Sequence, residues 1–213
     1  MNLVGHLEVA ARCGLGEAGQ LGAILPDIAS MLRVRVDRDA LAGLADGADV
    51  VAGVAVHHAT DAAFHDHVVV RGSMAAINVS LAERGVARGA ARSAAHVGYE
   101  MLLDAVADDR LPAVMRSADD DLVRAALGAP DPWPELRDYF AHRVACHDDP
   151  EWVAERLYAV LRHRPRLAFP QGQVLAVAAV LSEHAPAIRA NAPAIFDDVT
   201  SATARSTRSQ ARR

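Results

Sequence analysis

Apolar residues recur with helical spacing along most of the chain, and this pattern constrains the fold more than any other feature of the sequence. The breakers between the periodic segments are short, so we expect successive helices to follow one another closely. The expected helices lie near residues 2–12, 19–32, 38–45, 48–66, 70–84, 90–108, 119–128 and 134–146, with more after residue 150. The sequence therefore predicts an all-α fold.

The composition favours close packing of these helices within one domain. Alanine, valine and leucine dominate, while aromatic residues make up only 4% of the chain, and small side chains let helices approach one another closely. A chain of 213 residues, 52% of them hydrophobic, is long enough for one sizeable core. We expect a single compact multi-helix domain over residues 1–198. Residues 199–213 are polar, basic and non-periodic, which predicts a disordered tail.

Local signals place several helix ends after residue 130. Asp149 is a suitable N-cap with Pro150 at the first helical position, and another helix is expected to start near Pro134. A helix over 151–163 should end in the turn "RHRPRLAFPQG", because its two prolines disfavour helix. Two further helices are expected at 171–184 and 186–198.

The charged and sulfur-containing residues exclude several classes of protein. The net charge of -5 argues against nucleic-acid binding. All 22 basic residues are arginine, so the chain has no lysine for a Schiff base or a Walker-type phosphate loop. Cys13 and Cys146 form no CxxC pair, which suits a reducing compartment. The start of the chain has no basic leader, and no apolar run reaches the roughly 18 residues of a membrane span. We expect a cytoplasmic protein without a membrane segment.

The stretch "HHATDAAFHDH" concentrates ionisable side chains directly after an apolar run. On a helix His57, Asp61 and His65 fall within about 80° of one another, with His58 at the edge of the same arc. Asp66 and His67 point elsewhere unless the helix ends there. A second set follows at His96, Glu100 and Asp104, spaced i, i+4 and i+8.

Either set alone could be hydrogen-bonded core residues or surface helix pairs. Two sets in apolar sequence favour a metal site, because burying several carboxylates is costly unless a cation or hydrogen bonds compensate. His6 and Asp27 are further candidates, since apolar residues flank each of them. Mixed histidine and carboxylate ligands suit Mn, Fe or Zn, and the number of carboxylates leaves room for one or two ions.

Five short motifs, in order over residues 1 to about 167, resemble the acyl carrier protein phosphodiesterase family, an HD-domain-like branch of metal-dependent phosphohydrolases. "MNLVGHL" is similar to N-F-L-A-H-L, "LGAILPDI" to G-N-L-L-x-D-F, and "VVAGVAVHHATD" to V-x-x-G-I-x-x-H-R-x-I-D. "GYEMLL" resembles W/Y-D-H-F-L, and "LRHRPRL" resembles a late R-R-P-R-L segment.

The chain departs from the family pattern at several positions. His58 replaces an arginine, Glu100 replaces an aspartate, and His96 stands where a carboxylate is common. The segment "DAAFHDH" carries one extra residue, so His65, Asp66 and His67 remain alternatives for the family's second aspartate.

The resemblance implies an HD-domain-like hydrolase that releases 4'-phosphopantetheine from acyl carrier protein. It implies metal ligands among His6, Asp27, His57, Asp61, His65, His96 and Glu100, with Mn or Fe favoured over Zn or Mg. Asp61, Arg164 and Arg166 would be catalytic, the two arginines as a clamp on phosphate. Arg33, Arg35 and Arg38 could meet the acidic carrier protein, although the same arginines suit an ordinary exposed loop.

Two alternatives to hydrolysis stay open at this point. Some HD-like proteins are di-iron oxygenases, and the histidine-rich site suits iron as well as manganese. The chain could also be a non-catalytic helical protein that binds a metal or a partner for stability. The sequence does not determine the oligomeric state.

Overall fold

The computed structural model describes residues 1–128, 131–142 and 145–210, and it contains ten α-helices, two short 3-10 helices and no strand within these ranges. The all-α prediction is confirmed. The elements are α1 Leu3–Arg12, α2 Glu17–Leu32, η1 Asp39–Leu41, α3 Gly47–Asp66, α4 Val68–Glu83, α5 Arg88–Asp104, α6 Leu111–Ser117, α7 Asp120–Leu127, α8 Trp133–His142, α9 Pro150–Leu161, η2 Gln171–Gln173 and α10 Val174–Gln210.

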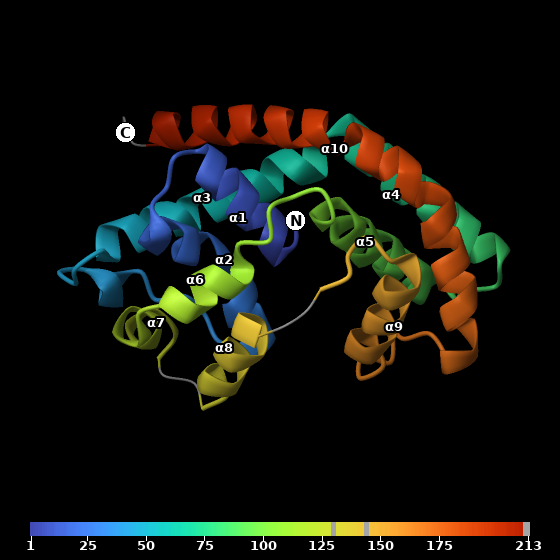
Figure 1. Ribbon diagram of the computed structural model, residues 1–213, viewed down its shortest axis with the longest axis horizontal. Coiled ribbons are helices and arrows are strands. Elements are labelled where there is room, and N and C mark those ends of the chain that lie inside the picture. Colours follow the sequence, from blue (N-terminus) through green and yellow to red (C-terminus); the bar gives the residue numbers. More distant parts are fainter. Residues whose placement is uncertain (129–130, 143–144, 211–213) are drawn as a thin grey trace.

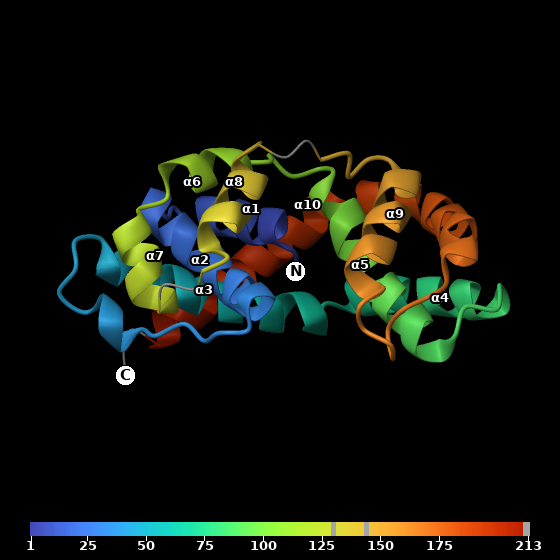
Figure 2. The ribbon, with the colours of Figure 1, turned by 90° about the horizontal axis from the view of Figure 1, so that it is seen from below.

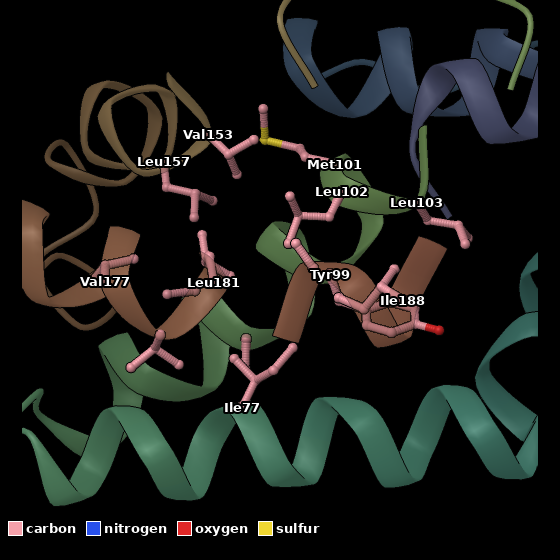
Figure 3. Packing of buried hydrophobic residues seen from close by; sticks show 14 of the residues in the cluster. Ile77, Tyr99, Met101, Leu102, Leu103, Val153, Leu157, Val177, Leu181 and Ile188 are labelled. Carbon is pink, nitrogen blue, oxygen red and sulfur yellow. The ribbon is translucent and has the colours of Figure 1, made fainter. Parts of the chain in front are cut away.

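Two hydrophobic clusters form most of the interior. The first cluster joins α4, α5, α9 and α10, and Figure 3 shows Ile77, Tyr99, Leu157, Leu181 and Ile188 meeting inside it. The second cluster joins α1, α2, α6, α7 and α8. In Figure 1 helices α2, α6, α7 and α8 of the second cluster lie on the left of the molecule and α5 and α9 of the first on the right, with the N-terminus between them. Helix α1 contributes side chains to both clusters.

Helix α10 differs most from the sequence prediction. Two helices and a disordered tail from residue 199 were expected, but α10 continues through Pro186 and Pro193 to Gln210. Figure 1 shows it bending across the top of the molecule, and it packs against α3, α4, α5 and α9. This packing compensates for the backbone hydrogen bonds that the prolines remove. Val199 and Thr203 are buried, so the apolar contacts continue beyond residue 198. Residues 211–213 lie outside the described part.

Other helix boundaries agree more closely with the sequence. Helix α9 begins at Pro150, and the Asp149 side chain accepts a hydrogen bond from the backbone N–H of Glu151, as predicted. The helix expected at 38–45 is reduced to η1, because Gly43 and Asp46 adopt positive φ angles that end a helix. The helix expected at 134–146 ends at His142, although residues 143–144 lie outside the described ranges. The short helix α6 was not predicted.

Candidate metal centre

Helices α2 and α3 approach each other closely enough for their backbones to touch. A Cβ atom at Gly22 would lie 2.2 Å from the carbonyl oxygen of Val50, and one at Gly53 would lie 2.0 Å from that of Gly19. Only glycine fits such a contact without movement of the backbone. The approach brings Asp27 on α2 to the face of α3 that carries the histidine and aspartate stripe.

The same contact fixes the orientation of His57. Its Nδ1 donates a hydrogen bond to the backbone carbonyl of Ala23 at 2.9 Å. Burial, followed by the neighbouring His6, lowers the pKa of His57 to about 3, so the ring is neutral near pH 7. A neutral ring that donates through Nδ1 has an unprotonated Nε2. This Nε2 lone pair lies 3.5 Å from Oδ2 of Asp61, which is also an acceptor.

His6, Asp27 and His57 form the first ligand group. Their ligand atoms lie within 4.8 Å of one another, and the rings of His6 and His57 stack with centroids 4.0 Å apart. None of the described residues forms an aligned hydrogen bond with either ring nitrogen of buried His6 or with Oδ2 of Asp27. Buried polar atoms normally have a partner, so these atoms match a site that binds a cation.

Asp61 lies beside this group and is more exposed than its members His6, Asp27 and His57. Its Oδ1 is 3.2 Å from Nε2 of His6, and 37% of its side chain is exposed. Burial acts to raise the pKa of Asp61, but His6 and the Met1 ammonium outweigh burial and hold that pKa well below its ordinary value. Burial dominates at Asp27 instead and raises its pKa to about 6.

The Met1 ammonium connects the first group with a second one. It lies 2.9 Å from Oδ1 of Asp61 and 3.1 Å from Oε1 of Glu100. Burial acts to lower the pKa of this ammonium, but the two carboxylates outweigh burial and raise it. A positive charge therefore already lies between Asp61 and Glu100.

His65, His96 and Glu100 form the second ligand group, with ligand atoms within 4.8 Å of one another. His96 donates from Nε2 to Oε1 of Glu100 at 2.9 Å, and this bond raises the pKa of His96. Burial, followed by the charge of the Met1 ammonium, lowers the pKa of His65. All seven residues predicted as ligands thus lie in these two groups or, for Asp61, between them.

Asp104 has a different role from the one its spacing suggests. Its Oδ1 accepts from the backbone N–H of Gly5 at 3.0 Å, and its Oδ2 accepts from Nδ2 of Asn2 at 2.7 Å. The carboxylate therefore caps the start of α1 and holds the turn that carries His6. The spacing of four residues from Glu100 drew attention to Asp104 in the sequence. That spacing did not predict that Asp104 would form hydrogen bonds with the start of α1.

The other ionisable residues of "HHATDAAFHDH" do not join the ligand groups. Asp66 is exposed at the end of α3, and Nε2 of His67 lies 3.3 Å from Oδ2 of Asp198 on α10. His58 is exposed beside His57, with ring centroids 5.2 Å apart. Among His65, Asp66 and His67, only His65 joins a ligand group.

The predicted phosphate clamp lies elsewhere. Arg164 and Arg166 are exposed in the turn between α9 and η2, and the carbonyl oxygen of Arg166 lies against Gly89 at the start of α5. At 1.5 Å per residue, Gly89 is roughly 16 Å along α5 from Glu100. Within the described chain, no ion pair joins either arginine to the ligand groups. Their predicted role stays a prediction.

Arg35 and Arg38 lie closer to the first ligand group. Together with Pro26 and His58 they line an open groove of about 500 Å³. Pro26 precedes Asp27, and His58 follows His57, so the groove adjoins the first group. Arg33 is exposed at the end of α2, where it has a positive φ angle.

Comparison with known proteins gives no family assignment. No protein-family model, curated protein or solved structure matches the chain. In the part of the chain that the structure describes, no helix is long and apolar enough to span a membrane. The geometry therefore defines an all-α protein with two side-chain groups that could hold metal ions.

Proposed function

We propose that the protein is a metal-dependent phosphohydrolase with an HD-domain-like site that acts on phosphodiesters. The convergence of His6, Asp27 and His57 within 4.8 Å carries the proposal, since none of the described residues forms an aligned hydrogen bond with either ring nitrogen of His6 or with Oδ2 of Asp27. The family resemblance supports the same reaction class. The family's His and Asp positions align with His57 and Asp61, which lie one turn apart on α3.

The chain offers neutral histidine nitrogens and carboxylate oxygens to the cation. The hydrogen bond to Ala23 directs the Nε2 lone pair of His57 into the site, as outer-shell carbonyls do for metal-bound histidines. His6 and Asp27 complete the first group, while Asp61 is placed to contact both groups. Such mixed ligands favour Mn or Fe over Mg, and the two groups provide for one or two ions.

A bound divalent cation would activate water and neutralise charge on the phosphoryl oxygens. Asp61 is the carboxylate best placed to orient that water, because it is the most exposed of the three ligand carboxylates. Asp27 and Glu100 would balance the positive charge from more buried positions.

Phosphate binding is assigned to arginine, which contacts phosphate in a bidentate manner. Arg35 and Arg38 are the better-placed candidates, because their groove adjoins the first ligand group. Arg164 and Arg166, the phosphate clamp that the resemblance implies, would contact a substrate that extends along α5. Acyl carrier protein is the proposed macromolecular substrate, and exposed Arg33, Arg35 and Arg38 offer it a basic surface.

The decisive experiment measures metal content and hydrolysis in wild type, Asp61→Asn and Asp66→Asn. Asp66 is an exposed aspartate on the same helix and serves as the matched control. We expect about one or two divalent ions per chain in wild type and in Asp66→Asn, and loss of metal in Asp61→Asn. Hydrolysis of bis(4-nitrophenyl) phosphate should follow the metal content. Metal-free wild type that stays metal-free after addition of Mn²⁺ or Fe²⁺ would refute the proposal.

A carrier-protein substrate is tested separately. Arg35→Glu together with Arg38→Glu should slow release of 4'-phosphopantetheine from acyl carrier protein. Arg71→Glu together with Arg205→Glu, two exposed positions on α4 and α10, makes the same change in net charge and is the control. If the two variants release 4'-phosphopantetheine at equal rates, Arg35 and Arg38 do not contribute to docking of the carrier protein.

A further inference from the structure

A second cavity, of about 420 Å³, is lined in part by sequence neighbours of the ligand residues and differs in character from the arginine groove. It is formed by the start of α1 together with parts of α2, α5, α8 and α9. In Figures 1 and 2 the N-terminus lies between α8 and α9, which flank this cavity. Its size falls in the range of small-molecule binding sites.

The walls of this cavity are mainly apolar. Val97, Met101, Leu136 and Trp152 line it, and Met31, Tyr139 and Val160 also line it although they are 48%, 43% and 49% exposed. Large hydrophobic side chains exposed together around one cavity mark a binding site more often than the same side chains scattered over a surface. The cavity is therefore suited to an apolar group.

A few polar groups accompany these walls. The Arg156 guanidinium lies over the Tyr139 ring, 5.0 Å from its centroid, which holds a positive charge at the cavity. His147 is buried, and its Nδ1 donates to the carbonyl oxygen of Met101 at 3.1 Å. The sequence did not single out His147. An apolar cavity with a fixed cation suits a ligand that has both an apolar and an anionic part.

None of the seven predicted ligands lines the cavity, but on three elements the cavity residues are close to them in sequence. Asn2 lines it and directly follows Met1, whose ammonium contacts Asp61 and Glu100. On α5, the cavity residues Val97 and Met101 directly follow His96 and Glu100. On α2, Met31 lies one helical turn after Asp27.

We infer that the apolar cavity binds the hydrophobic part of the substrate while the anionic group of the same molecule reaches the ligand groups. The substrate class is then an amphiphilic phosphate ester, with an alkyl or aryl chain bonded through oxygen to the phosphate. This inference rests on the proposed function, because it takes the phosphate to be bound where the metal is held.

The test uses octanol, octyl phosphate and inorganic phosphate as probes in calorimetric titrations of the full chain, in chelator and with Mn²⁺. We expect octanol to bind equally under both conditions. With Mn²⁺, octyl phosphate should bind at least about tenfold more tightly than either octanol or phosphate, because both parts of one ligand are then held.

The variant Met31→Ser/Val160→Ser removes apolar surface from two exposed positions and leaves the ligand groups intact. This variant should bind octanol and octyl phosphate about tenfold more weakly than wild type, since several methylene contacts are lost. Leu175→Ser is the matched control, because Leu175 is 76% exposed on α10 outside the cavity. Metal content should be the same in all three proteins.

Octyl phosphate that binds no better than phosphate, or an unchanged affinity in Met31→Ser/Val160→Ser, would overturn the inference. Failure of the proposed function gives a different result. Wild type would then bind no Mn²⁺, and octanol binding in chelator would still show whether the cavity accepts an apolar ligand.

Discussion

Replacement of Asp27 by asparagine should stabilise the metal-free protein while removing its affinity for metal. Asp27 is a ligand candidate whose Oδ2 has no aligned hydrogen bond from the described residues. Burial raises the pKa of Asp27 from 3.8 to about 6, so the folded protein resists the charged form at neutral pH. Asparagine has nearly the same shape and carries no charge.

The magnitude follows from the pKa shift. In the native state the group holds its proton up to about pH 6, whereas the unfolded chain releases it near pH 3.8. The native state therefore binds more protons between these values, and stability falls as the pH rises through this window. A shift of about 2 units corresponds to about 3 kcal/mol. Because 29% of the side chain is exposed, solvent screening reduces the expected gain to about 2 kcal/mol.

Denaturant unfolding in chelator, repeated from about pH 3 to pH 7, measures this gain. Asp27→Asn should exceed wild type by about 2 kcal/mol at pH 7 and match it near pH 3, where the carboxyl group is mostly protonated in both states. Asp66→Asn should stay within about 0.5 kcal/mol of wild type throughout. Added Mn²⁺ should stabilise wild type but not Asp27→Asn. Lower stability of Asp27→Asn at pH 7, or a gain that does not vary with pH, would refute the reasoning.

Four further predictions concern the fold around the site. Gly53→Ala should lower stability by about 2 kcal/mol or more in thermal melts, whereas Gly72→Ala, where a Cβ atom meets nothing within 4 Å, should raise it by about 0.5–1 kcal/mol. Asp104→Ala should weaken metal retention by removing the cap of α1, and equal Mn²⁺ affinities in wild type and variant would exclude that role. Truncation after residue 198 should lower the melting temperature, since Val199 and Thr203 are buried; an unchanged melting curve would show that the end of α10 adds no stability. Saturation with Mn²⁺ at 100 times its dissociation constant should stabilise wild type by about 2.7 kcal/mol relative to chelator, and identical melting curves would argue against a bound ion.

Helical periodicity predicted the fold class and most helix positions because both depend on local spacing. It failed where tertiary packing decides the outcome. Pro186 and Pro193 lie inside one continuous helix, since neighbouring helices hold α10 along its length. The burial of Val199 and Thr203 depends on α3 and α10 lying side by side, and no local pattern encodes that contact.

The residues of the two ligand groups were singled out from the sequence, but their geometry was not predicted. The spacing of His57, Asp61 and His65 places them on one face of α3, and the structure agrees. The division into two ligand groups depends on the glycine contact between α2 and α3 and on the position of the Met1 ammonium. Sequence spacing within single helices carries no information on either feature.

The two hydrophobic clusters have a consequence for how the protein unfolds. The ligand groups draw His6 and Asp27 from helices of the second cluster, and His96 and Glu100 from a helix of the first. An ion in the first group would join helices of the second cluster to α3, and an ion in the second group would join α5 of the first cluster to the same helix. Amide hydrogen exchange should then slow in both clusters when metal is added, since opening either one would release a ligand.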